Sequence, residues 1–378
     1  MKNNFKIVFA CLLFVFFASF GFAFDFGVAL DSSFLIYDTE NFQTDETTME
    51  ISEGVTLWAR EKISKNISFY TKGNYQFSYD FEDFSQKIDL SNFQVQMIFP
   101  KSDTTKIALD LGRFPVFDAG RMIYNNPIDG GKIALEISQL DLELFCGYTG
   151  LLNGKSINIA DSTVITDNDK VYSLASGFVA AGFSTTAKNF FKNNSISFDI
   201  STFVPTSADE DRKTALYSEI GINGALSSMI YHDLYAGVSL FFTEEPKAGV
   251  FFDGTLSCYP GFLSSCIATE ITFVTDTYFP FVDNSCVLGE SESLNGLFKW
   301  GLTGSIKPVS TLLLAIGGDF VMDVEGSSFA KDCIQWNSSL KWQILSDVQF
   351  DMYIAQKIPL TDVVKPLFLG SASLVINF

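Results

Sequence analysis

The sequence predicts an all-β protein, a transmembrane up-and-down antiparallel β-barrel of about 18 strands, with 16 strands as the alternative. Apolar and polar residues alternate through most of the chain, the chain ends inside such a segment, and aromatic residues make up 15% of the sequence. Alternation at a period of two places one set of side chains on each face of a strand. A single-layered sheet can therefore carry much apolar surface on one face without long apolar runs.

The first 23 residues have the pattern of a signal peptide. Lys2 and Lys6 precede an apolar run from Ile7 to Phe20, and small residues lead up to Ala23, where a signal peptidase would cleave. The run is shorter than the about 20 residues that a spanning helix needs, so it is not expected to remain as an anchor. We predict export, cleavage after Ala23, and a single barrel domain over residues 24–378.

The strand pattern is clearest over residues 24–36, 67–79, 311–323 and 335–344. In each of these segments the apolar residues share one face, and the other face is mostly polar. If lipid surrounds the barrel, a residue such as Lys341 would cost roughly 2 to 4 kcal/mol on the lipid side at the bilayer midplane. The polar face is therefore expected to line the lumen.

The predicted strands are joined by connections that alternate in length. Residues 64–66 and 307–310 are short connections, whereas 149–172 and 276–292 are long ones. In an up-and-down barrel every other connection lies at the same rim. The alternation indicates tight turns at one rim and loops at the other.

The last residues, Gly370 to Phe378, form a predicted strand that stops on an aromatic residue. Closing a barrel requires the last strand to pair with the first, because an open edge in lipid leaves backbone polar groups without partners. This strand resembles the recognition signal that the barrel-assembly machinery reads in bacterial outer-membrane proteins. The resemblance implies a cell outer membrane location, with the short turns at the periplasmic rim. The assembly signal would comprise Phe368, Leu374, Ile376 and Phe378.

The most unusual predicted connection runs from Leu111 to Leu135, LGRFPVFDAGRMIYNNPIDGGKIAL. It resembles the corresponding region of porin-like barrels, in particular the phenylalanine-rich treponemal (spirochaete) outer-membrane proteins, in which a Gly-Arg-Phe turn, an Asp and an Asp-Gly recur. General porins fold the loop at this position into the lumen. The resemblance implies that the loop at 114–131 folds inward and brings four charged residues to the pore constriction. These are Arg113, Asp118, Arg121 and Asp129.

Opposed charges at such a constriction would create a transverse field that selects solutes by charge and dipole. The alternative is an ordinary exposed loop whose Asp-Gly and Asn-Pro pairs only form turns.

Acidic residues dominate the charge of the chain. Loss of residues 1–23 would remove two lysines and no acid, so the net charge of −19 would become −21. This argues against nucleic-acid binding, which needs a basic face. Acids on the lumen face would attract cations and repel anions, or would only hydrate a wide wall. The predicted lumen-lining acids are Asp25, Asp31, Asp110, Glu136, Asp319, Asp323 and Asp351.

Residues for catalysis or metal binding are scarce. His232 is the only histidine, it is placed in a short turn, and no Cys-x-x-Cys motif occurs. Hydrolysis needs an imidazole beside its partner, so no enzyme, cofactor or metal is expected. The five cysteines left after cleavage do not form a disulfide framework. A bond between Cys258 and Cys266, which bracket a turn-like segment, is left open.

The function that these observations favour is an outer-membrane porin-like channel for passive diffusion of small hydrophilic solutes, with a preference for cations. Barrels of 16 to 18 strands leave an aqueous lumen. The alternative is a surface adhesin or structural barrel that acts through its acidic loops, and a third reading is a secreted soluble β-protein. The expected partners are outer-membrane lipid, the barrel-assembly machinery and small hydrophilic solutes, without nucleic acid. A homo-oligomer is left open.

Overall fold

The computed structural model describes residues 25–38, 47–80, 83–102, 104–157, 170–207, 213–243, 245–281, 295–325, 328–360 and 366–378. The predicted signal peptide and Cys286 lie outside these residues. Within them, no helix is long and apolar enough to cross a membrane.

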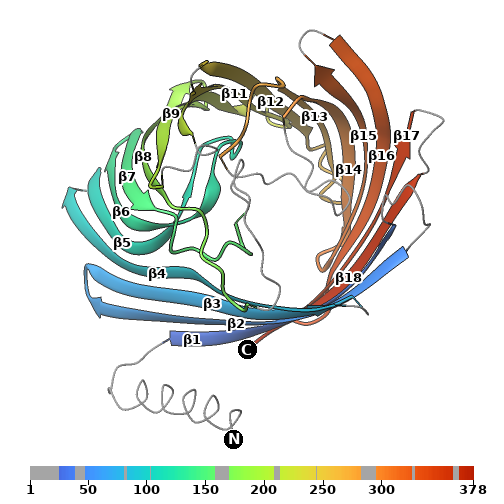
Figure 1. Ribbon diagram of the computed structural model, residues 1–378, viewed down its shortest axis with the longest axis horizontal. Helices are drawn as coiled ribbons and strands as arrows, with labels where there is room; N and C mark the ends of the chain where they lie inside the picture. The colour runs from blue at the N-terminus through green and yellow to red at the C-terminus, as the bar shows by residue number, and fades with distance from the viewer. Residues whose placement is uncertain are drawn as a thin grey trace, which may run out of the picture.

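The described residues form one 18-stranded antiparallel sheet that closes into a barrel (Figure 1). The predicted fold class and strand number are confirmed. The strands are β1 Asp25–Asp38, β2 Thr47–Ser64, β3 Ile67–Tyr79, β4 Phe84–Ser102, β5 Thr105–Phe117, β6 Asn125–Ile137, β7 Leu140–Tyr148, β8 Phe178–Phe191, β9 Asn194–Pro205, β10 Thr214–Ala225, β11 Ile230–Phe242, β12 Lys247–Cys258, β13 Cys266–Val274, β14 Leu297–Val309, β15 Leu312–Glu325, β16 Ser328–Gln343, β17 Val348–Pro359 and β18 Leu367–Asn377.

Each strand pairs with its neighbours in the chain, and β18 pairs with β1 from Leu369↔Tyr37 to Asn377↔Ala29. At the end of this seam the backbones of Val28 and Phe378 exchange two hydrogen bonds, of 3.1 and 2.8 Å. The last residue of the chain is therefore part of the pairing that closes the barrel.

The two faces of the wall differ as the alternation predicts. Leu57, Leu144, Ile220 and Ile316 are each more than half exposed and lie on the outer face of their strands. Exposed apolar side chains of this kind continue around the barrel from strand to strand. Such a band suits lipid and is far larger than the apolar patches of a soluble monomer.

The connections also follow the predicted alternation. Both described ends of the chain and the turns after the even-numbered strands β2 to β16 share one rim. The connections after the odd-numbered strands share the other rim, and the longest of them join β7 to β8 and β13 to β14. Parts of these two connections turn into the barrel (Figure 1). The connection after β7 bonds to Arg113 and to the edge of β4, and the connection after β13 bonds to Met122 and Ile123 in the β5–β6 hairpin.

Candidate pore constriction

The β5–β6 hairpin leaves the barrel wall. Strand β4 pairs with β5 only as far as Phe93↔Arg113, and β7 pairs with β6 only as far as Asp129↔Tyr148. Beyond these points the described residues give the hairpin no wall neighbour on either side, although β5 and β6 stay paired with each other up to Phe117↔Asn125. We call residues 113–129 the inner hairpin.

The inner hairpin has a shorter loop than the sequence predicts. The predicted connection at 114–131 is in fact two paired strand ends joined by residues 118–124. Pro115 and Pro127 suggest a loop, but they lie opposite each other within the hairpin. Two prolines in this arrangement have their nitrogens on the outer edges of the pair, where no strand needs an N–H donor.

Two paired glycines mark the place where the hairpin bends away. Gly112 and Gly130 lie opposite each other, and Gly112 has a φ of 111°. A Cβ atom on Gly112 would lie 2.1 Å from the carbonyl oxygen of Phe93, and one on Gly130 would lie 2.1 Å from that of Cys146. Only glycine allows the hairpin backbone to leave the wall so close to both neighbours.

Arg113 stabilises the base of the inner hairpin through four hydrogen bonds. Its Nε and Nη2 atoms donate to the two carboxylate oxygens of Asp129, at 2.8 and 2.7 Å. Its Nη1 and Nη2 atoms also donate to the carbonyl oxygens of Leu90 and Leu151, at 2.9 and 2.8 Å. The side chain is buried. The predicted constriction charges Arg113 and Asp129 therefore neutralise each other.

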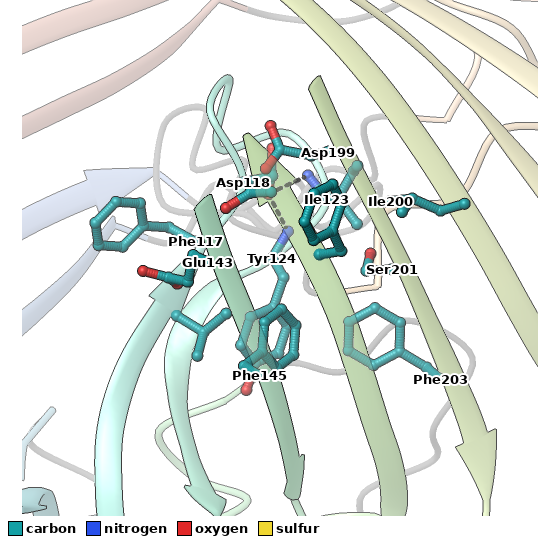
Figure 2. A pocket seen from close by; sticks show the side chains of 13 residues that line it. Phe117, Asp118, Ile123, Tyr124, Glu143, Phe145, Asp199, Ile200, Ser201 and Phe203 are labelled. Carbon is teal, nitrogen blue, oxygen red and sulfur yellow. Dashed lines mark hydrogen bonds between the residues drawn. The ribbon is translucent and has the colours of Figure 1, made fainter. Parts of the chain in front are cut away.

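Asp118 stabilises the turn at the tip of the inner hairpin, residues 118–124. Its carboxylate accepts hydrogen bonds from the backbone N–H groups of Met122, Ile123 and Tyr124, at 2.8, 3.1 and 2.7 Å. Figure 2 shows Asp118 above Ile123 and Tyr124, with Asp199 beside it. The buried carboxylate thus holds the turn closed and is not a free charge in the lumen.

The tip reaches the lumen face of β9 and β10. The backbone N–H of Gly120 donates to Glu219 Oε1 at 2.7 Å, and that of Ala119 donates to Asp199 Oδ2 at 3.4 Å. Asp199 and Glu219 are register partners on adjacent strands, and both are buried beneath the tip. The hairpin therefore extends from the wall at β5 and β6 to the wall at β9 and β10.

The segment after β13 meets the tip from another side. The Tyr278 hydroxyl donates to the carbonyl oxygen of Met122 at 3.0 Å, and the Phe281 backbone N–H donates to that of Ile123 at 3.1 Å. Burial raises the pKa of the Tyr278 hydroxyl, so it stays protonated and able to donate. These contacts join two connections that start on different parts of the wall.

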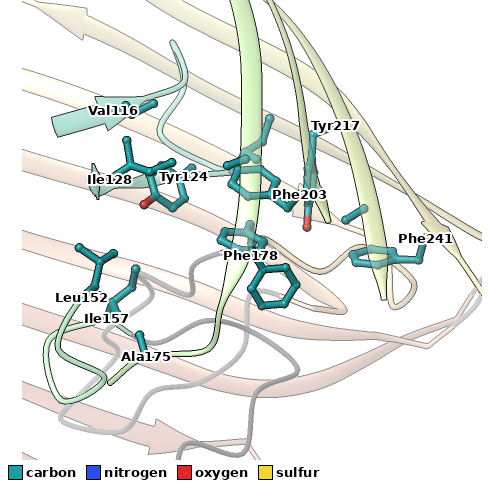
Figure 3. Close-up of a cluster of buried hydrophobic side chains, with 14 of the residues drawn as sticks. Val116, Tyr124, Ile128, Leu152, Ile157, Ala175, Phe178, Phe203, Tyr217 and Phe241 are labelled. Atoms are coloured by element: carbon teal, nitrogen blue, oxygen red, sulfur yellow. The ribbon is translucent and has the colours of Figure 1, made fainter. Parts of the chain in front are cut away.

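Aromatic side chains fill the space between these segments. The rings of Phe203 and Phe281 stack at 3.7 Å between centroids, and Tyr124 packs against both. Figure 3 shows Phe178, Phe203, Tyr217 and Phe241 in the same cluster. This core lies inside the barrel, so the many phenylalanines serve both faces of the wall.

The connection after β7 lines a second part of the lumen. Asn153 donates through its side-chain amide to the carbonyl oxygen of Ile88 at 2.7 Å, and the backbone N–H of Ile88 donates to Val171 at 3.1 Å. Where β5 turns inward and no longer pairs with β4, this connection therefore provides the hydrogen-bonding partners of β4.

Arg121 differs from the other three predicted constriction residues. It is exposed at the tip, has a φ of 57°, and places its guanidinium 5.3 Å from the centre of the Phe117 ring. The other three charged side chains bind partners that fix the hairpin. Arg121 is thus the predicted constriction residue whose charge faces open space.

Two of the predicted lumen acids, Asp110 and Glu136, have basic partners. Lys132 Nζ lies 3.7 Å from a carboxylate oxygen of Asp110 and 3.3 Å from one of Glu143. Lys106 Nζ lies 3.1 Å from a carboxylate oxygen of Glu136. The register puts the remaining predicted acids on the same face of their strands as other inward residues: Asp25 and Asp31 on β1, Asp319 and Asp323 on β15, and Asp351 on β17.

Asp199 and Glu219 are not among the site residues predicted from the sequence. The alternation in β9 and β10 does put both on the polar face, but their partners at the tip are 80 and 99 residues away. The ion pair of Lys299 and Glu270, with 2.9 Å between Nζ and Oε1, is not among the predicted residues either. His232, predicted in a turn, is buried in β11. Cys258 and Cys266 are both free thiols.

No protein-family model matches the chain, and no curated protein matches its sequence. Solved structures do match. OpdK of Pseudomonas aeruginosa superimposes with a TM-score of 0.65 at 10% identity, over 95% of this chain and 100% of that one. OccK5 (OpdH) of the same species gives 0.63 at 12% identity, over 94% and 98%. OccAB3 of Acinetobacter baumannii gives 0.63 at 10% identity, over 94% and 99%.

These neighbours are outer-membrane porins, and at such low identity the similarity shows the fold alone. They come from Pseudomonas and Acinetobacter, so the resemblance to treponemal proteins stays a prediction.

Proposed function

We propose that the protein is an outer-membrane channel for passive diffusion of small hydrophilic solutes and that the inner hairpin forms its constriction. The observation that carries this proposal is the course of the hairpin, which leaves the wall at Gly112 and Gly130 and bonds to Asp199 and Glu219 on other strands. The porin fold of the structural neighbours supports it. One neighbour, OpdK, has been solved with vanillate.

The proposed channel prefers cations. The chain has a net charge of −19, and Asp25, Asp31 and Asp319 lie on the inward face of their strands. Fixed lumenal acids attract counter-ions within a Debye length of about 10 Å at 0.1 M salt. Arg113 adds no field of its own because Asp129 neutralises it.

The alternative remains a structural or adhesive barrel. The observation that favours it is the aromatic core inside the barrel, because packed side chains there reduce the space for water.

Conductance in a planar bilayer separates the two functions. The channel predicts discrete conductance steps and a cation preference that fades as salt rises, because screening shortens the reach of the lumenal acids. Arg121→Gln should raise the cation-to-anion permeability ratio, since it removes the exposed positive charge at the tip. Lys65→Gln makes the same charge change in the exposed turn between β2 and β3, and should leave the ratio unchanged.

A folded barrel without conductance would favour the structural alternative. If the Arg121 and Lys65 variants have equal permeability ratios, the protein still acts as a channel, but the tip of the inner hairpin does not line the path of the ions.

A further inference from the structure

Three carboxyl groups meet where the inner hairpin contacts the wall. Glu219 is 1% exposed, Asp118 is 8% exposed and Asp199 is 9% exposed. Glu219 Oε1 accepts from the Gly120 N–H, but no group in the described structure donates to Glu219 Oε2. The side chains of Asp118 and Glu219 interact directly, and a hydrogen bond between them requires a proton on one of the two carboxyl groups. Glu219 therefore combines a fully buried oxygen that lacks a donor with a second carboxyl group nearby.

Two ionised carboxylates have only acceptor oxygens, so they cannot hydrogen-bond to each other. A proton on either one supplies the missing donor, and buried carboxyl pairs share protons for this reason. A single proton would thus satisfy Glu219 Oε2 and turn a repulsive contact into a hydrogen bond.

Apart from the backbone N–H groups of the tip, the described surroundings place no positive charge against these carboxyl groups. Among the described residues, no lysine or arginine forms an ion pair with Asp118, Asp199 or Glu219. The charged and titratable groups on the packed elements are Arg121 on the tip, which is exposed, Glu143 on β7, which is paired with Lys132 on β6, Tyr235 and Asp233 on β11, and Tyr278 after β13.

The space beside Asp118 and Asp199 is also small. A cavity of about 20 Å³ lies between the tip and the wall, lined by Asp118, Glu143 and Asp199 among others, and has room for about one water molecule (Figure 2). No group of three or more His, Cys, Asp or Glu side chains among the described residues is placed to hold a metal ion. A proton fits this geometry better than a bound metal ion.

We propose that one proton shared between Glu219 and Asp118 latches the inner hairpin to β10, and that its loss releases the tip and widens the constriction. Arg113 and Asp129 keep the base of the hairpin in place, so the movement is confined to the tip, residues 118–124. On release, the proton passes to water. This inference rests on the proposed function only in its second half, since the latch itself requires no solute flow.

The first test is conductance as a function of pH. In about 1 M salt, where the Debye length is about 3 Å, other lumenal acids contribute little to ion flow. The wild-type step should be larger at about pH 11 than at about pH 5, because two buried carboxyl groups in contact release their shared proton only at high pH. Glu219→Gln keeps an acceptor for Gly120 N–H and adds an N–H donor for Asp118. This variant should keep the small step at both pH values.

Asp351→Asn is the matched control. It also removes one inward carboxyl charge, but from β17, where Gln349 is its partner and the hairpin makes no described contact. This variant should keep the wild-type pH dependence. A Glu219→Gln channel with the same pH dependence as the wild type would overturn the latch, and so would a step that responds to EDTA or Mg²⁺ rather than to pH.

The second test follows the tip directly. Spin labels at Arg121→Cys on the tip and Thr303→Cys on the inward face of β14, with the native cysteines replaced by serine, report their separation by electron paramagnetic resonance. The separation should change between about pH 5 and about pH 11 and should stay constant when Glu219→Gln is added. An unchanged separation in the labelled chain with Glu219 present overturns the latch. A separation that changes in a barrel without conductance would support the latch and refute the channel.

Discussion

At the scale of single residues, Arg113 was predicted to place its charge in the pore, but it stabilises the base of the inner hairpin instead. Arg113→Ala should lower the free energy of unfolding by about 3 to 5 kcal/mol, because it leaves the carboxylate of Asp129 and two carbonyl oxygens without their donor. Urea unfolding in lipid vesicles, followed by tryptophan fluorescence, measures this loss.

Two controls bracket the effect of Arg113→Ala. The double variant Arg113→Met, Asp129→Leu should cost less than Arg113→Ala, because it leaves no unpaired buried charge. Lys106→Ala breaks an ion pair whose side chains are 42% and 49% exposed, and should cost about 0 to 1 kcal/mol. If Arg113→Ala lowers the free energy of unfolding no more than Lys106→Ala does, Arg113 does not stabilise the base of the hairpin.

At the scale of elements, the bend in β5 depends on Gly112. Gly112→Ala places a methyl group 2.1 Å from the Phe93 carbonyl oxygen at a φ of 111°. We expect the variant to yield less folded barrel, because the hairpin can no longer leave the wall at this point. The mobility shift on electrophoresis with and without heating measures the folded fraction.

Gly304→Ala is the control for this substitution, because nothing lies within 4 Å of the corresponding Cβ position. Its stability should change by less than about 0.5 kcal/mol. Equal folded fractions for the two variants would show that the bend does not require glycine.

The elements also show what the sequence can and cannot predict. Strands such as β3 and β16 could be predicted because each one carries its own alternation, and lipid selects the same outer face everywhere. The extent of the inner hairpin could not be predicted, because Pro115 and Pro127 usually interrupt strands and here lie on free edges. The roles of Asp199 and Glu219 depend on contacts across the lumen, which no local pattern encodes.

For the whole molecule, the seam that closes the barrel includes the last residue. Deleting Phe378 removes both backbone hydrogen bonds to Val28 and the final outward ring. We expect less folded, heat-modifiable protein in the outer membrane, because the seam between β1 and β18 is shortened at its end. Quantitative blotting of heated and unheated membrane fractions measures this amount.

Phe378→Leu separates the contributions of the ring and the backbone. It keeps the two hydrogen bonds, so a defect as large as that of the deletion would assign the effect to the aromatic side chain. Wild-type assembly of the deletion variant would contradict the role predicted for the terminal strand.

The docking of the inner hairpin also has a consequence for the order of folding. The turn itself is local, since Asp118 binds backbone groups four to six residues away, but the partners of the tip follow 80 to 158 residues later in the chain. Contacts of such high sequence separation form late. Until then both edges of the hairpin are open to pairing with another chain, and Pro115 and Pro127 each remove one donor from these edges. We expect the two prolines to reduce such pairing, and with it aggregation, while the barrel is unfinished.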